Sequence, residues 1–171
     1  TAETLVVNYL PAGTQLGESE SGVVQANTVV FPFNYGALTR ENGAALTNEG
    51  LTLWRNAAYL LTDLPVPTEL CSSPALTKQV LYLNQKGVDP GNTGASEPGN
   101  DPITRMLDED PNFKVTYVET YTGGQQIPDP QLYDLVIAQE TLSSGSSFFQ
   151  PGGKLAPGTI KAPIIYNKAS V

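Results

Sequence analysis

The chain has 171 residues, a length that predicts one domain with a sizeable buried core. Its 17 acidic residues outnumber its 9 basic ones, so the net charge of −8 disfavours nucleic acids and anionic membrane surfaces, which bind clustered Lys and Arg. Hydrophobic residues make up 40% of the chain, but no apolar run approaches the roughly 20 residues that a membrane-spanning helix needs.

The N-terminal part begins with two runs typical of β-strands, residues 4–10 and 23–33, the second of which contains a clear strand at 28–31. The segment between them is rich in Gly, Ser and Glu, which predicts a turn or loop.

The strongest helix prediction covers residues 47–62. Thr47 is a good N-cap, and Glu49 places a negative charge in the first turn, where the helix dipole favours it. Apolar residues recur at helical spacing on one face, namely Leu51, Trp54, Ala58 and Leu61, and the stripe is widened by Leu53, Ala57 and Leu60. We expect Trp54, the only tryptophan, to anchor this helix on a sheet.

Residues 64–77 form a proline-rich connector that contains Pro65, Pro67 and Pro74 and favours an extended conformation. It divides the chain into an N-terminal strand–helix part, 1–63, and a C-terminal part, 78–171. The single Cys71 lies in the connector and cannot form an intrachain disulfide. It is either an unpaired thiol or half of an intermolecular disulfide in a secreted assembly.

The C-terminal part alternates strands with a helix. A strand at 79–83 is followed by a long polar loop and by a helix that Asp101 caps and Pro102 opens. That helix should bury Ile103, Met106 and Leu107 and end at 111–112. Further strands are predicted at 114–119, 133–139 and 162–166, with a short helical turn at 143–149. The unbroken apolar run at 133–139 is typical of a parallel strand buried on both faces.

This order predicts an α/β fold, a flavodoxin-like three-layer domain with a mainly parallel sheet. Such a domain should continue with another strand and a closing helix, and here the strand at 28–31 and the helix at 47–62 can supply both. Either they fold back on the sheet of the same chain, as in a circular permutant, or they complete a neighbouring chain. The stiff connector favours the second arrangement because it would hold the two parts apart.

The segments YDLVIAQE (133–140) and APIIYNKA (162–169), with NTVVFPF (27–33) and LTNEGLTLWRNAAYLL (46–61), identify a resemblance. They resemble flavodoxin-like domains related to class I glutamine amidotransferases, and in particular the trehalose-utilisation-type domains of secreted bacterial proteins. The resemblance covers most of the chain, but its segments stand in swapped order and a middle section is absent.

The resemblance also implies where a nucleophile would lie. The amidotransferase relatives carry a catalytic Cys on the sharp turn after the strand that matches 133–139. This chain has Glu140, Ser143 and Ser144 in that region, no Cys there, and no His anywhere. A Cys–His or Ser–His system therefore cannot be assembled, and either serine would need a Lys or carboxylate base.

Ligands of open parallel sheets bind outside the carboxyl ends of the strands, which here are followed by the loops 84–100, 119–130 and 139–145. The candidate ligand-binding residues in and around these loops are Asp89, Asn92, Thr93, Asp101 and Glu140. The first loop matches neither the dinucleotide nor the P-loop pattern, so no cofactor is expected. The acidic residues are scattered, so no metal site is predicted beyond a loosely held Ca²⁺.

Two functions fit these observations. The first is a non-catalytic structural or binding module, extracellular or at the cell surface, that assembles head-to-tail with copies of itself into a homo-oligomer or filament. It depends on the missing His, the absent Cys and the acidic, loop-rich composition. The second is a carbohydrate-directed hydrolase that uses carboxylates, with Glu140 as general acid or base together with Asp89 or Asp101. Nucleic-acid binding and membrane insertion are expected for neither.

Overall fold

The computed structural model describes residues 7–17, 22–31, 48–65, 77–85, 102–120, 126–139, 141–143 and 145–167. These segments contain the strands β1 (Asn8–Leu10), β2 (Thr28–Val30), β3 (Lys78–Gln85), β4 (Phe113–Thr120), β5 (Leu135–Gln139) and β6 (Ile164–Asn167). Their helices are α2 (Asn48–Leu61), α3 (Pro102–Glu109) and the short 3₁₀ helix η2 (Pro130–Leu132). Among the helices described, none is long and apolar enough to span a membrane.

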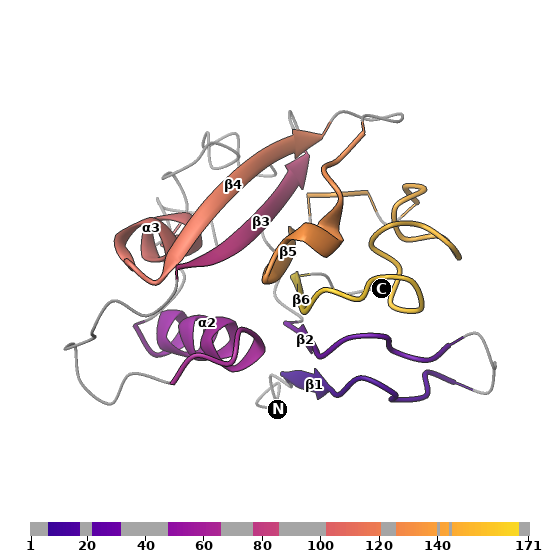
Figure 1. Ribbon diagram of the computed structural model, residues 1–171, viewed down its shortest axis with the longest axis horizontal. Helices are drawn as coiled ribbons and strands as arrows, with labels where there is room; N and C mark the ends of the chain where they lie inside the picture. The colour runs from indigo at the N-terminus through magenta and orange to yellow at the C-terminus, as the bar shows by residue number, and fades with distance from the viewer. Residues whose placement is uncertain are drawn as a thin grey trace, which may run out of the picture.

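The strands form one sheet in the order β1-β2-β6-β5-β3-β4 (Figure 1). All neighbours are parallel except β1 and β2. The predicted α/β class with a mainly parallel sheet is therefore confirmed. From the edge strand β4 inward, the parallel strands lie in the order β4-β3-β5-β6-β2. If β3 is counted as the first strand of the domain and β2 as the fifth, this is the order 2-1-3-4-5, which is compatible with a flavodoxin-like fold. In this structure β2 pairs with β6 of the same chain.

Two predicted strands begin later than expected. Before β5, Tyr133 donates its N–H to the carbonyl of Pro130 and so closes the turn of η2 instead of extending the strand. Before β6, Pro163 has no N–H to contribute to a sheet, and the strand begins at the next residue.

The two faces of the sheet are covered differently (Figure 1). Helices α2 and α3 cover one face, where Val80, Ile137 and Ile165 are buried. The irregular segments 141–143 and 145–162 cover the other face, on which Leu142, Leu155 and Ile160 join the core. Helices α2 and α3 thus lie on the same face of the sheet. In the region of the predicted helical turn at 143–149, Ser146 donates its N–H to the carbonyl of Ser143, and Phe149 donates its N–H to the carbonyl of Ser146.

Close backbone packing explains part of this irregular layer. A Cβ atom at Gly153 would lie 2.2 Å from the carbonyl oxygen of Ser147 and 2.4 Å from that of Phe148. The Cβ atom of any other residue at this position would force the backbone at 153 away from that at Ser147 and Phe148. The Gly and Pro content of the segment thus favours a tightly folded loop over a helix.

Helix α2 packs as predicted around Trp54, whose ring stacks on Phe31 with the centroids 4.5 Å apart. Both side chains are fully buried, so the role of Trp54 as a core anchor is confirmed. The prediction that Leu53 and Leu60 widen the apolar stripe is wrong, because these side chains are 41% and 50% exposed. These two positions are seven residues apart and therefore share the outer face of the helix, whereas Tyr59 points inward.

A three-residue cluster fixes α2 to the turn between α3 and β4. The Tyr59 hydroxyl donates to Asp110 Oδ2 at 2.7 Å and accepts from Asn112 Nδ2 at 2.8 Å. Asn112 Nδ2 also donates to Asp110 Oδ1 at 2.9 Å. Burial, together with the hydrogen bond and the negative charge of Asp110, raises the pKa of Tyr59 to about 12. The cluster therefore holds Tyr59 in its protonated form.

Replacing Tyr59 by Phe should lower the free energy of unfolding by about 1–2 kcal/mol at neutral pH, because a buried hydrogen-bonded hydroxyl is lost. The wild-type stability should fall between pH 10 and pH 12, because the unfolded tyrosine ionises near pH 10 and the folded one near 12. Tyr59→Phe should lose less stability over this range, although Tyr166, whose pKa burial also raises, titrates in both proteins. Urea unfolding at a series of pH values measures both effects.

The matched control is Tyr9→Phe, because Tyr9 is 45% exposed and lies on the short strand β1. Its stability should match the wild type at every pH. Equal alkaline stability loss in Tyr59→Phe and the wild type would show that the cluster does not determine the stability of α2.

Candidate functional site

A row of polar side chains crosses the carboxyl ends of three parallel strands. Asn84 of β3 is one residue beyond the Leu83–Ala138 pair and so lies level with Gln139 of β5, which is in register with Asn167 of β6. Because side chains alternate along a strand, all three share the face that Tyr82 and the helices occupy. The row spans the place between β3 and β5 where the strand order reverses, which is where α/β sheets of this kind bind ligands.

We call the side chains of Tyr82, Asn84, Gln139 and Asn167 the amide row, and hydrogen bonds connect Tyr82, Gln139 and Asn167 within it. Asn167 Nδ2 donates to Gln139 Oε1 at 2.6 Å. Gln139 Nε2 donates in turn to the Tyr82 hydroxyl at 2.5 Å. Gln139 and Asn167 have no solvent-exposed surface, and Tyr82 and Asn84 are buried as well. The bonds compensate the cost of burying these amides, which is large when such groups are unpaired.

Two buried polar atoms near the end of the row lack a hydrogen-bond partner among the described residues, namely Asn167 Oδ1 and Trp54 Nε1. Val30 pairs with Tyr166, and the N–H of Phe31 donates to the Tyr166 carbonyl. The register therefore places Phe31 level with Asn167 on the neighbouring strand, and Trp54 stacks on Phe31. An open acceptor and an open donor thus flank one aromatic ring.

Such atoms are costly to bury, at roughly 1–3 kcal/mol for each unpaired group. A group that both donates and accepts, such as a hydroxyl or a water molecule, would satisfy either atom. The amides of the row do not ionise, so they offer hydrogen bonds but no proton transfer. Within the described segments, no three His, Cys, Asp or Glu side chains gather closely enough to hold a metal ion.

Most residues singled out in the sequence lie outside the described residues, and their positions are therefore not tested: Cys71, Asp89, Asn92, Thr93, Asp101, Glu140 and Ser144. Ser143 is described and lies in the turn after β5, with an exposed side chain. Its carbonyl accepts the N–H of Ser146 at 3.0 Å. The structure thus places Ser143 on the surface of the turn.

The loops predicted to hold ligands begin at the carboxyl ends of the strands, where the amide row also lies, but the residues of the row were not predicted. Asn84 and Gln139 fell inside the loops considered, and Asn167 inside a segment used only for the resemblance. A shared signal could have found them, because three apolar runs each end in an amide residue: YLN at β3, IAQ at β5 and IYN at β6.

Comparison with protein-family models, with curated proteins and with solved structures finds no significant match. The resemblance to amidotransferase-related domains therefore stays a prediction. The class of the fold rests on the strand order and pairing of this chain.

Replacing Gln139 by Leu should lower the free energy of unfolding by roughly 2 kcal/mol or more, because Asn167 Nδ2 and the Tyr82 hydroxyl would both lose a buried partner. Adding Asn167→Leu should cost less in this background than in the wild type, since the interaction between the two amides is already gone. Urea unfolding of the two single variants and the double variant measures this coupling.

Gln150→Leu is the matched control, because Gln150 is exposed in the irregular layer. Its stability should stay within about 0.5 kcal/mol of the wild type, as for most surface changes. Additive effects of Gln139→Leu and Asn167→Leu would contradict the connected row.

Proposed function

We propose that this chain is a non-catalytic, extracellular binding module that takes a neutral, hydroxyl-rich ligand of the carbohydrate class at the amide row. The proposal is supported by the position of the row at the carboxyl ends of β3, β5 and β6, where this class of sheet binds ligands. The acidic, loop-rich composition and the resemblance to domains of secreted bacterial proteins support an extracellular or cell-surface location.

One observation carries the choice of ligand. Asn167 Oδ1 can accept a hydrogen bond and Trp54 Nε1 can donate one, and neither has a partner among the described residues. A sugar hydroxyl both donates and accepts, so it can satisfy either atom. A charged ligand is disfavoured because a charge in a buried, neutral row would lose its hydration without an opposite charge to compensate.

The architecture supports a finer interpretation of the fold. We interpret β2 and α2 as the closing strand and helix of a flavodoxin-like domain whose order along the chain is permuted. The parallel pairing of β2 with β6 and the packing of Trp54 on Phe31 support this interpretation. In an unpermuted chain the same strand and helix would follow β6.

A panel of neutral mono- and oligosaccharides, titrated by calorimetry, tests the binding function. Wild type should bind at least one member, and Trp54→Phe should bind it about tenfold more weakly, because one buried hydrogen bond is lost while a ring stays to stack on Phe31. Tyr133→Phe is the control, since Tyr133 lies before β5 at the opposite edge of the sheet. Failure to bind any neutral sugar, or unchanged binding by Trp54→Phe, would contradict the proposal.

The alternative function, carbohydrate hydrolysis by carboxylates, is favoured by one position. Glu140 directly follows Gln139, so in sequence it adjoins the amide row. The same panel is therefore incubated with wild type and Glu140→Gln and assayed for released reducing ends. We expect no turnover by either protein. Turnover by wild type that disappears in Glu140→Gln would replace the non-catalytic function by the hydrolytic one.

We further propose that copies of the chain associate head-to-tail into a homo-oligomer or filament. In the described sheet the two edges differ, because one is the short strand β1 and the other the eight-residue strand β4. Pairing β4 of one copy with β1 of the next joins two different surfaces, which leads to rings or open filaments.

Light scattering at micromolar concentration should therefore detect species larger than the 18.2 kDa monomer. Tyr9→Glu should shift them toward the monomer, because a charge on an edge strand opposes pairing. Leu132→Glu is the control, since Leu132 is 77% exposed but belongs to η2 and not to an edge. A compact monomer in the wild type would rule out the association.

A further inference from the structure

A cavity of about 340 Å³ lies beside the amino ends of β3, β5 and β6, at the opposite end of these strands from the amide row. Its size lies in the range of small-molecule sites. Leu61 and Ala162 are buried and provide apolar surface, and charged side chains from separate parts of the chain line the rest. The cavity is distinct from the amide row, which lies at the carboxyl ends of the strands.

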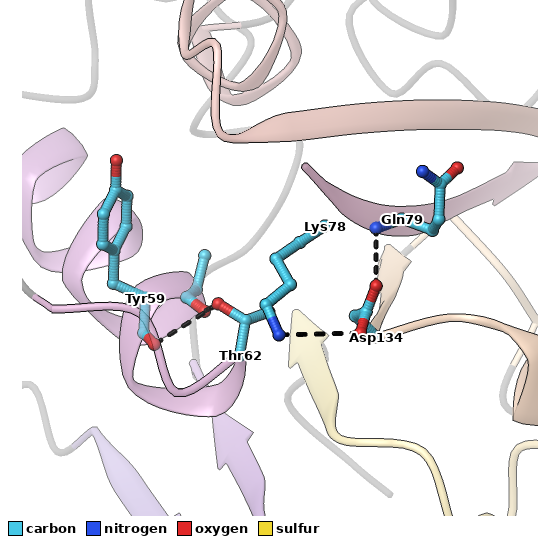
Figure 2. A network of polar contacts seen from close by, with 6 residues as sticks. Tyr59, Thr62, Lys78, Gln79 and Asp134 are labelled. Carbon is cyan, nitrogen blue, oxygen red and sulfur yellow. Dashed lines mark hydrogen bonds and ion pairs between the residues drawn. The ribbon is translucent and has the colours of Figure 1, made fainter. Parts of the chain in front are cut away.

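The first wall of the cavity carries an ion pair between Lys78 and Asp134 (Figure 2). Lys78 Nζ lies 3.7 Å from Asp134 Oδ1. Asp134 Oδ2 accepts the backbone N–H of Gln79 at 2.8 Å, and this bond fixes the carboxylate against β3. The charges of Lys78 and Asp134 therefore largely compensate each other at this wall.

A second wall is the C-terminal end of α2. The Thr62 hydroxyl donates to the carbonyl of Ala58 at 2.7 Å and to that of Tyr59 at 3.3 Å, as Figure 2 shows for Tyr59. The next residue, Asp63, has a φ of 54° and ends the helix in the left-handed conformation. Its exposed carboxylate adds a negative charge where the helix dipole is already negative, so this wall favours a cation.

A third wall carries Lys161. Its backbone N–H donates to Gln131 Oε1 at 3.0 Å, which fixes the main chain at this point. The side chain is exposed. Among the described residues neither Lys161 nor Asp63 takes part in an ion pair. The cavity thus has one positive and one negative side chain that are not compensated within it, together with an apolar surface.

We propose that this cavity binds a small zwitterion, an α-amino acid with an apolar side chain. Its ammonium group lies toward Asp63 and the end of α2, its carboxylate toward Lys161, and its side chain against Leu61 and Ala162. A ligand with both charges is favoured over one with a single charge, because each ligand charge then has an opposite charge in the wall. The inference is independent of sugar binding at the amide row.

The test uses the full chain and L-leucine as the probe, titrated by calorimetry at low salt. Two comparison compounds each lack one charge: 4-methylpentanoate has no ammonium and 3-methylbutylamine has no carboxylate. Leucine should bind at least tenfold more tightly than either, and its affinity should fall as salt screens the charges. Equal affinity for leucine and either comparison compound, or no binding of leucine, would overturn the proposal.

Variants assign the two charges. Lys161→Met and Asp63→Asn should each weaken leucine binding at least fivefold, and Asn is chosen because it tolerates the left-handed backbone of Asp63. Lys114→Met is the control, because Lys114 is exposed on β4 and does not line the cavity. All three positions are exposed, so the variants should keep the unfolding midpoint of the wild type. Unchanged leucine binding by both Lys161→Met and Asp63→Asn would overturn the proposal.

Discussion

The parallel pairing of β2 with β6 is the contact on which the rest of the structure depends. It sets Phe31 level with Asn167, and Phe31 then gives Trp54 a ring to stack on. With Trp54 in place, α2 covers one face of the sheet and brings Tyr59 to Asp110 and Asn112. A shift of β2 by one residue would turn Phe31 to the other face and remove the support of α2. One register therefore determines a core, a buried polar cluster and the walls of both candidate sites.

The carboxyl and amino ends of the parallel strands accommodate polar side chains in different ways. Asn84, Gln139 and Asn167 at the carboxyl ends of β3, β5 and β6 are buried. Their side chains are neutral, and Gln139 and Asn167 are hydrogen-bonded to each other. The amino edge opens to solvent, so Lys78 and Asp134 can stay charged while they pair. Burial thus explains why amides gather at the carboxyl ends of the strands, whereas the ion pair of Lys78 and Asp134 forms at the amino ends. It also explains why the carboxyl ends of the strands suit a neutral ligand and the amino ends a charged one.

Local patterns predicted the elements well, because each depends on residues close in sequence. The apolar runs of β3, β4 and β5 and the cap signals of α2 and α3 are of this kind. Contacts between distant residues were not predictable in the same way. Tyr59 and Asp110 are 51 positions apart, and periodicity alone could not tell that Tyr59 turns inward while Leu60 turns to solvent. The cavity likewise joins the end of α2 to residues about one hundred positions later, and no motif in the sequence marks it.

Helix α2 connects the two candidate sites, as does β3, which carries Lys78 at the cavity and Asn84 in the amide row. Trp54 stands beside the amide row and Thr62 lines the cavity, eight residues further along. At 1.5 Å per residue these positions are about 12 Å apart along the helix axis. Residues that far apart without shared partners usually act independently, so the effects of changes at the two ends should add. The hydrogen bond between Tyr59 and Asp110 holds α2 near its C-terminal end, between Trp54 and Thr62, and so helps to keep these two positions at a fixed distance.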